Sequence, residues 1–167
     1  MTPPFRLEQL SDQHDRDSFT CGDVALDRYL HTQATQDIRR RIANCFVAIE
    51  VATGRLAAYY TIASAGVPIT ELPPSVSKRL PRYPTLPAVR IGRLAVDLGF
   101  RGRGLGSALL ADAVRRTLQA PPAVFTPLVD AKNEEAANFY RHHGFLSLTS
   151  QPRTLFLPLA TTITLLK

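Results

Sequence analysis

Three glycines and two arginines occupy the segment "RGRGLG", residues 101–106, directly before a stretch with helical character. Successive backbone N–H groups in such a turn form a concave nest of donors, and the following helix N-terminus adds partial positive charge. Glycine permits the required backbone angles and the close approach of an anion. The segment therefore predicts a phosphate-binding loop, with a tight strand-to-helix turn as the plainer alternative. Its spacing matches neither the Walker loop nor the dinucleotide fingerprint.

The charge pattern also favours an anionic partner. The chain has 20 Lys and Arg against 14 Asp and Glu, a formal net charge of +6. Arginine predominates, and its planar fork suits phosphate. A merely solvated basic surface is the alternative for any single cation, but clustering favours a partner. The clusters are Arg39, Arg40 and Arg41; Lys78, Arg79 and Arg82; and Arg90, Arg93, Arg101 and Arg103.

The cysteines and histidines do not predict a metal site, because the sequence has no CxxC or HExxH motif. Cys21 and Cys45 are typical of reduced, buried thiols, and a nucleophilic Cys21 is the weaker reading. No apolar run approaches the ~20 residues that span a bilayer, and the N-terminus has no signal-peptide core. We therefore expect a cytoplasmic protein with neither metal nor membrane anchor.

The elements that must position these residues predict an α/β protein with one domain, residues 1–167. A hairpin is expected over 45–65, and a proline-rich loop with one short helix at 75–80 is expected over 68–87. Asp23 and Asn133 are candidate N-caps, and Gly144 is a candidate C′ residue. Helices are expected at 21–42, 107–119 and 133–144, and further strands at 5–10, 88–96, 123–131, 145–150 and 154–166.

Two motifs resemble those of the GNAT family, the Gcn5-related N-acetyltransferases. Arg101, Gly104 and Gly106 match its R/Q-x-x-G-x-G/A loop. The segment 133–145 resembles a second motif, in which Asn133, Ala136, Tyr140, Gly144 and Phe145 have the familiar spacing. The resemblance covers about residues 45–149. It implies an α+β fold with a mixed, mostly antiparallel central sheet, flanking helices and splayed strands around acetyl-CoA.

The same resemblance implies which residues bind acetyl-CoA. The loop amides would take the pyrophosphate, Arg101 and Arg103 would neutralise it, and the strand "RLAV" would bind the pantetheine arm. The implied contacts are Leu94, Ala95, Val96, Arg101, Gly102, Arg103, Gly104, Leu105, Gly106, Ser107, Asn133 and Asn138.

The N-terminal half resembles a narrower group, the GNAT toxins of bacterial type II toxin–antitoxin modules. The segments "FTCGDVALDRYL" and "YYTI" are similar to that group's F-x-C-G-x-x-x-L-D-x-Y-L and Y-Y-T-L patterns. The resemblance implies acetylation of the α-amino group of aminoacyl-tRNA, a ribbon-helix-helix antitoxin and a homodimer. It makes the basic clusters tRNA contacts: Arg39, Arg40, Arg41, Lys78, Arg79, Arg82 and Arg90.

The chemistry needs a proton donor for the departing thiolate, and Tyr140 is our candidate general acid. A phenol is protonated at neutral pH, and Arg141, His142 and His143 are candidates to lower its pKa. An ordinary core aromatic is the alternative. Glu50 and Asp97 are the nearest acids on the central strands, yet an α-amine needs little help from a base. Alternative functions are acetylation of a small-molecule amine, antibiotic or protein N-terminus, and a non-catalytic nucleic-acid-binding module.

Overall fold

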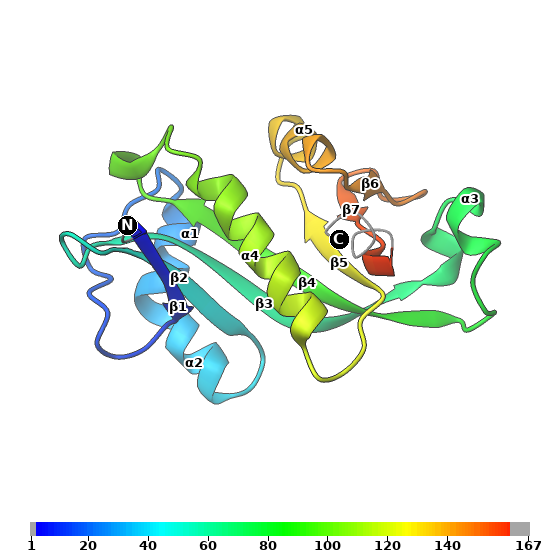
Figure 1. Ribbon diagram of the computed structural model, residues 1–167, viewed down its shortest axis with the longest axis horizontal. Helices are drawn as coiled ribbons and strands as arrows, with labels where there is room; N and C mark the ends of the chain where they lie inside the picture. The colour runs from blue at the N-terminus through cyan, green and yellow to red at the C-terminus, as the bar shows by residue number, and fades with distance from the viewer. Residues whose placement is uncertain (1–2, 161–167) are drawn as a thin grey trace. The chain divides into compact units, whose positions relative to one another are not determined.

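The computed structural model describes residues 3–160, whose strands form one sheet in the order β1-β2-β3-β4-β5-β7-β6 (Figure 1). The β4–β5 pair is parallel, whereas β1–β2, β2–β3, β5–β7 and β6–β7 are antiparallel. This mixed sheet with helices confirms the predicted α/β class. The chain divides into two compact units, Met1–Ala63 with Gly92–Arg115 (unit 1) and Ser64–Ile91 with Arg116–Lys167 (unit 2). The single domain stays a prediction.

Unit 1 is built on the predicted hairpin, which the structure confirms as β2 (Asn44–Glu50) and the first part of β3 (Leu56–Pro68). Strand β1 (Phe5–Gln9) adds to it antiparallel. Neighbouring residues of β3 point to opposite faces of the sheet. Tyr59 donates a hydrogen bond to Leu26 O of the N-terminal helix, whereas Tyr60 donates to Asp112 of α4 (Leu105–Gln119). The two helical layers of unit 1 therefore cover opposite sheet faces.

The N-terminal helix is interrupted, so the prediction of one helix over 21–42 is wrong in detail. It consists of α1 (Val24–Arg28), the π-helical η1 (Tyr29–Gln33) and α2 (Ala34–Arg39). The predicted N-cap is confirmed, because the Asp23 side chain accepts hydrogen bonds from the first-turn amides. The buried core beneath this helix contains Leu10, Phe19, Cys21, Tyr29, Leu30, Ala34, Cys45, Val47, Ile49, Leu56, Tyr59 and Ala95.

Strand β4 (Thr85–Val96) starts earlier than predicted, inside the proline-rich segment. Pro87 fits because its carbonyl accepts a hydrogen bond from Phe125 N, a contact that needs no N–H from the proline. The rest of that segment contains η2 (Ile69–Glu71) and α3 (Pro74–Ser77), so the short helix lies close to its predicted place. Beyond β4, η3 (Leu98–Phe100) leads to the glycine-rich loop and α4.

Unit 2 contains β5 (Thr126–Asp130), α5 (Glu134–His142), β6 (Leu146–Ser147) and β7 (Thr154–Phe156). Helix α5 is confirmed with its Asn133 N-cap and with Gly144 in left-handed conformation, φ +93°. The two last strands are shorter than predicted, and residues 161–166 of that prediction lie outside the described residues. The core of this unit contains Val67, Leu72, Leu86, Ala88, Leu128, Leu148 and Phe156.

Within residues 3–160, no helix is long and apolar enough to cross a membrane. The same residues contain no group of three His, Cys, Asp or Glu side chains that could hold a metal ion.

Candidate functional site

The glycine-rich loop of unit 1 has backbone angles that favour glycine. Gly102 and Gly104 both have φ of +75°, and the loop between η3 and α4 is exposed. Helix α4 begins at Leu105, so Gly106 and Ser107 lie in its first turn and not in the loop itself. The first N–H groups of a helix have no intrahelical acceptor. Loop and helix start together therefore supply the kind of amide row that a phosphate requires.

The "TCG" segment of the N-terminal motif holds this loop in place. Buried Asp97 accepts hydrogen bonds from Thr20 N at 3.0 Å and from Gly99 N at 2.8 Å. Arg101 donates from Nη2 to the carbonyl oxygen of Cys21 at 2.6 Å. Asp97 is thus engaged in holding the backbone, and the geometry does not favour it as a general base.

The two loop arginines already contact protein groups. Arg101 is bonded to the backbone of the N-terminal segment. Arg103 lies over the rings of Phe5 and Phe100, and its Nη1 is 3.5 Å from a Glu50 carboxylate oxygen. Their proposed neutralisation of a phosphate stays a prediction. Glu50 is occupied by Arg103 and by the Thr53 hydroxyl, so it too is a poor candidate for a base.

Strand β4 carries the expected pantetheine-binding segment, Leu94 to Val96, in unit 1. Ala95 is buried in the core, whereas Leu94 and Val96 point to the other face and are half-buried. The pairing of β4 with β5 runs from Ala88 to Ile91 and ends before this segment begins.

Tyr140 lies near the end of α5 in unit 2, in an aromatic setting. Its ring stacks on Phe139 at a centroid distance of 5.3 Å and packs against Phe145 at 5.9 Å. The side chain is half-buried. This position is compatible both with a general acid and with an ordinary core aromatic, so the role of Tyr140 stays a prediction.

The expectation that cations lower the pKa of Tyr140 is wrong. Burial raises that pKa, and the negative charge of Asp130 raises it further. Arg141 is directed elsewhere, because its Nη1 pairs with Glu134 at 2.8 Å. The ring of His143 instead lies edge-on to Phe139. The phenol is therefore held protonated at neutral pH, as a donor requires.

The two asparagines of the expected acetyl-CoA contacts have local partners. Asn133 Oδ1 accepts the N–H of Ala136 at 2.8 Å, as the N-cap of α5. Asn138 Oδ1 accepts a hydrogen bond from Arg141 at 3.0 Å. Their contribution to acetyl-CoA binding stays a prediction.

The arginines 39–41 are all exposed to solvent. They do not share one helix, however, because α2 ends at Arg39. Arg41 has φ of +60° and donates its N–H to Ile38 O at 3.1 Å, and the next N–H bonds to Asp37 O at 2.9 Å. This is a Schellman ending, with arginine where glycine is usual.

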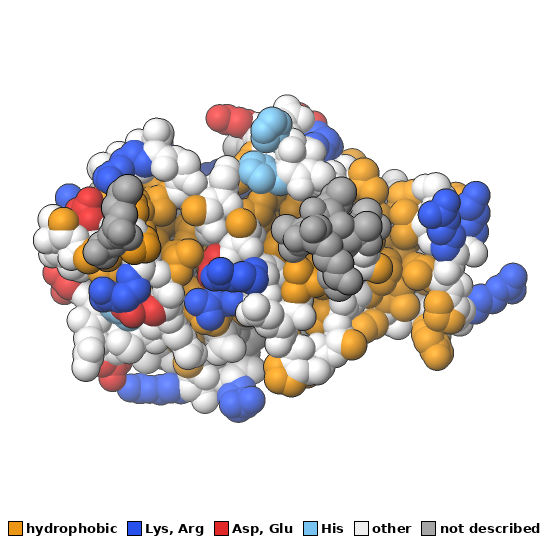
Figure 2. All heavy atoms as spheres, viewed as in Figure 1, with side chains coloured by type: hydrophobic (Ala, Val, Ile, Leu, Met, Phe, Trp, Pro, Cys, Tyr) orange, Lys and Arg blue, Asp and Glu red, His pale blue; other side chains and the backbone are white. Residues whose placement is uncertain are grey.

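The second basic cluster lies after α3 in unit 2. Lys78, Arg79 and Arg82 are exposed, and Figure 2 shows Lys and Arg side chains gathered around this part of the molecule. Arg90 differs, since it is half-buried and ion-paired with Asp130. The geometry thus favours the first three cations over Arg90 as contacts for a large anion.

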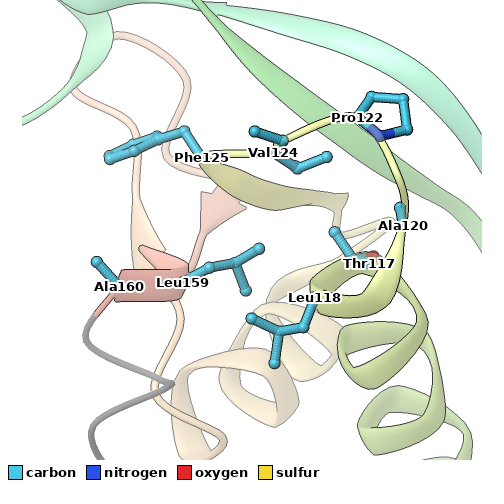
Figure 3. A pocket seen from close by; sticks show the side chains of 9 residues that line it. Thr117, Leu118, Ala120, Pro122, Val124, Phe125, Leu159 and Ala160 are labelled. Carbon is cyan, nitrogen blue, oxygen red and sulfur yellow. The ribbon is translucent and has the colours of Figure 1, made fainter.

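One pocket in unit 2 is unrelated to this chemistry. It has a volume of about 360 Å³ and lies at the C-terminal end of α4, where the labelled side chains are almost all apolar (Figure 3). Its lining carries no titratable group: Thr117, Leu118, Ala120, Pro122, Ala123, Val124, Phe125, Leu159 and Ala160.

Three contacts important to the site were not predicted from sequence. These are the hydrogen bonds of Asp97 with Thr20 and of Arg101 with Cys21, and the stacking of Arg93 on Tyr29. The Arg101–Cys21 bond joins residues 80 positions apart, which no local pattern reveals. The available signal was that both partners belong to recognised motifs.

Sequence comparison places these features among known proteins. The family described as acetyltransferase (GNAT) domain matches residues 41–146. A tRNA-acetylating toxin of Mycobacterium tuberculosis is 36% identical over 151 residues, which cover 89% of each chain.

Solved structures are similar over nearly the whole chain. One is AtaT complexed with acetyl-methionyl-tRNAfMet, with a TM-score of 0.90 and 29% identity, covering 98% of this chain and 99% of that one. Another is a mutant AtaT toxin bound to the C-terminus of the antitoxin AtaR and acetyl-CoA. It has a TM-score of 0.79 and 25% identity and covers 99% of both chains.

Proposed function

Because this chain belongs to the GNAT family of acetyltransferases, we propose that it transfers the acetyl group of acetyl-CoA to the α-amino group of an aminoacyl-tRNA and thereby inhibits translation. The observation that carries the proposal is the 36% identity with a tRNA-acetylating toxin along 89% of the chain. The similarity to AtaT in complex with an acetylated aminoacyl-tRNA supports it.

In this proposal, acetyl-CoA supplies an activated acetyl thioester and unit 1 binds it. The N–H groups around Gly102 and Gly104 hold the pyrophosphate, and the α4 N-terminus adds partial positive charge. The backbone of Leu94, Ala95 and Val96 holds the pantetheine arm beyond Ile91, where the pairing of β4 with β5 ends. The hydrogen bonds from Thr20 and Arg101 keep the loop in its binding conformation.

As the amine nitrogen bonds to the acetyl carbon and the C–S bond breaks, Tyr140 donates the proton that the departing thiolate needs. The proton that the amine nitrogen loses balances the one that the phenol gives up. Its raised pKa keeps the donor protonated at neutral pH. A thiolate in the same desolvated surroundings also has a raised proton affinity, so burial does not by itself make the transfer unfavourable. The α-amino group titrates near ~8, so a useful fraction is already neutral for attack. This agrees with the engagement of Glu50 and Asp97 elsewhere.

The proposal extends to partners and location. The exposed arginines 39–41 and the cluster Lys78, Arg79 and Arg82 position the tRNA through its phosphates, which carry no sequence information. An active toxin requires neutralisation, and we assign this to a ribbon-helix-helix antitoxin. We further propose a homodimer that acts in the cytoplasm, where charged tRNA is found.

Incubation of the purified protein with acetyl-CoA and charged tRNA tests the proposal, with acetylated aminoacyl-tRNA measured by mass spectrometry. The rate should fall steeply with added salt, because tRNA binding releases counterions. Tyr140→Phe should lower kcat by roughly 10²- to 10⁴-fold and retain acetyl-CoA binding.

Tyr83→Phe is the matched control, since Tyr83 is 62% exposed and should leave the rate unchanged. Full activity of Tyr140→Phe would overturn the role of the phenol. Equal rates on free amino acids and charged tRNA, without salt dependence, would instead favour a small-molecule acetyltransferase.

A further inference from the structure

The guanidinium of Arg93 in β4 lies over an aromatic ring in unit 1. Its Cζ is 3.5 Å from the centroid of the Tyr29 ring. Attraction between a guanidinium and an aromatic face is significant out to about 6 Å, so this is a close stack. The Arg93 side chain is half-buried, which further limits the conformations available to it.

The ring beneath Arg93 is itself fixed. Tyr29 is buried and donates its hydroxyl hydrogen to Asp37 at 2.8 Å. It begins the π-helical turn, a feature that occurs frequently at functional sites. Its other neighbour is Tyr59, whose ring is nearly parallel at 6.4 Å. A phenol bonded to a buried carboxylate has a more electron-rich ring, which strengthens the hold on Arg93.

The face of the Arg93 guanidinium thus packs against the Tyr29 ring, whereas its N–H donors point outward along its edge. Within residues 3–160, this guanidinium makes no hydrogen bond or ion pair with a protein acceptor, in contrast to Arg101 and Arg103. A guanidinium held by its face presents its N–H groups in one plane. That plane matches two oxygens of a phosphate in bidentate geometry.

The position of Arg93 along β4 indicates which phosphate it would meet. The strand runs from Arg93 through Leu94–Val96, proposed for the pantetheine arm, toward the phosphate loop at Gly102 and Gly104. Arg93 therefore lies at the end of this segment where the thioester of the arm would be, away from the pyrophosphate. The acceptor amine must approach from the thioester end. In charged tRNA this amine belongs to the amino acid that is esterified to the 3′-terminal nucleotide.

We propose that Tyr29 and Asp37 are positioning residues that present the edge of Arg93 to a substrate phosphate, on the tRNA near its 3′ end. The inference rests on the proposed function. A phosphate of acetyl-CoA is the other source of the same chemistry, and the two sources are separable by experiment.

The test compares Arg93→Gln with wild-type protein in steady-state acetylation of charged tRNA and in calorimetry with acetyl-CoA. Arg93→Gln should raise KM for charged tRNA about tenfold, which corresponds to about 1.4 kcal/mol. It should also reduce the salt slope, which is the slope of the logarithm of the tRNA-binding constant against the logarithm of salt concentration. We expect a reduction of about 1, as for one lost phosphate contact. Acetyl-CoA affinity should not change.

Tyr29→Leu removes the stacking surface but keeps the charge of Arg93, so KM should rise while the salt slope falls less. Tyr59→Phe is the matched control, because it deletes a buried phenol hydrogen bond in the same core without removing the stack. It should lower stability and leave KM and slope unchanged. Urea unfolding of each variant separates loss of fold from loss of binding.

Unchanged KM, salt slope and acetyl-CoA affinity in folded Arg93→Gln would overturn the inference. Weaker acetyl-CoA binding with unchanged KM for tRNA would overturn the tRNA source and assign the phosphate to the cofactor. Failure of the wild-type protein to acetylate charged tRNA would instead overturn the proposed function, and this is measured before any variant is compared.

Discussion

Arg41 adopts a left-handed backbone conformation at the end of α2, with φ of +60°. Such angles cost a residue with a side chain about 1 to 2 kcal/mol, whereas glycine adopts them freely. Replacing Arg41 with glycine would relieve this strain, but glycine loses more backbone entropy on folding, which offsets part of the stabilisation. We expect Arg41→Gly to raise the free energy of unfolding by about 0.5 to 1 kcal/mol. Urea denaturation measures this directly.

Arg40→Gly is the control for that substitution. It removes the same charge from the adjacent C-cap residue, where φ is −81° and no left-handed strain exists. It should leave stability unchanged or lower it. If both variants behave alike, the strain at Arg41 is not the cause. If Arg41→Gly stabilises the fold but weakens tRNA binding, the arginine is retained at a stability cost for its charge.

At this scale, the sequence predicted residue types better than their partners. Gly102, Gly104, Tyr140 and Asn133 occupy the expected elements. Gly106 lies in the first turn of α4 instead of in the loop. The direction of the Tyr140 pKa was wrong, because adjacent cations in sequence can be directed away in space, as Arg141 is toward Glu134. Long-range partners, such as Arg93 for Tyr29, depend on strand register and could not be read from spacing.

The loop between η3 and α4 is the element on which acetyl-CoA binding depends in our proposal. Gly104→Asp places a negative charge where the pyrophosphate would lie and a side chain where φ is +75°. Space is available, since no heavy atom lies within 4 Å of an added Cβ, so the protein should remain folded. We expect acetyl-CoA binding to be lost in calorimetry and stability to fall by about 1 kcal/mol.

Gly54→Asp provides an unusually close control. Gly54 also has φ of +75° and open space around an added Cβ, but it lies in the β2–β3 turn. The two variants therefore carry equal backbone strain and equal charge. Only Gly104→Asp should lose acetyl-CoA. Unchanged affinity in Gly104→Asp, or equal losses in both, would contradict the assignment of the loop.

The N-terminal helix shows why element boundaries were harder to predict. Its apolar residues Leu26, Leu30, Ala34 and Ile38 recur every fourth position. Each step of four overshoots one α-helical turn by about 40°, so the apolar stripe would drift around the helix. A wider π turn corrects such drift, and η1 lies in the middle of the series. This four-residue spacing was visible in the sequence, but we interpreted it as one regular helix.

The whole molecule should lose stability at alkaline pH, because several buried acids resist deprotonation in the folded state. Burial raises the pKa of Cys45 to about 12 and that of Cys21 to about 11. Burial also raises the pKa values of Tyr29, Tyr59 and Tyr140. In the unfolded chain these groups ionise from about pH 8.5 upward. Above that pH the folded state binds more protons, so the free energy of unfolding falls as pH rises.

Urea unfolding in reductant across about pH 7 to about pH 11 measures this decline, which should begin near the unfolded thiol pKa. Cys45→Ala removes one contributor. The variant should be less stable at neutral pH, through loss of packing, and should show a shallower decline between neutral and alkaline pH. A flat stability profile for the wild-type protein over that range would contradict the prediction.

Asp97 and Arg101 bind the N-terminal segment through its main-chain atoms. Asp97 accepts a hydrogen bond from the N–H of Thr20, and Arg101 donates one to the carbonyl of Cys21. Every amino acid except proline supplies the first atom, and every amino acid supplies the second. The contacts therefore constrain how many residues the segment contains far more than which residues they are. Substitutions at these two positions leave the hydrogen bonds in place, except proline at position 20. An inserted or deleted residue in the segment would instead move both main-chain atoms out of hydrogen-bonding distance.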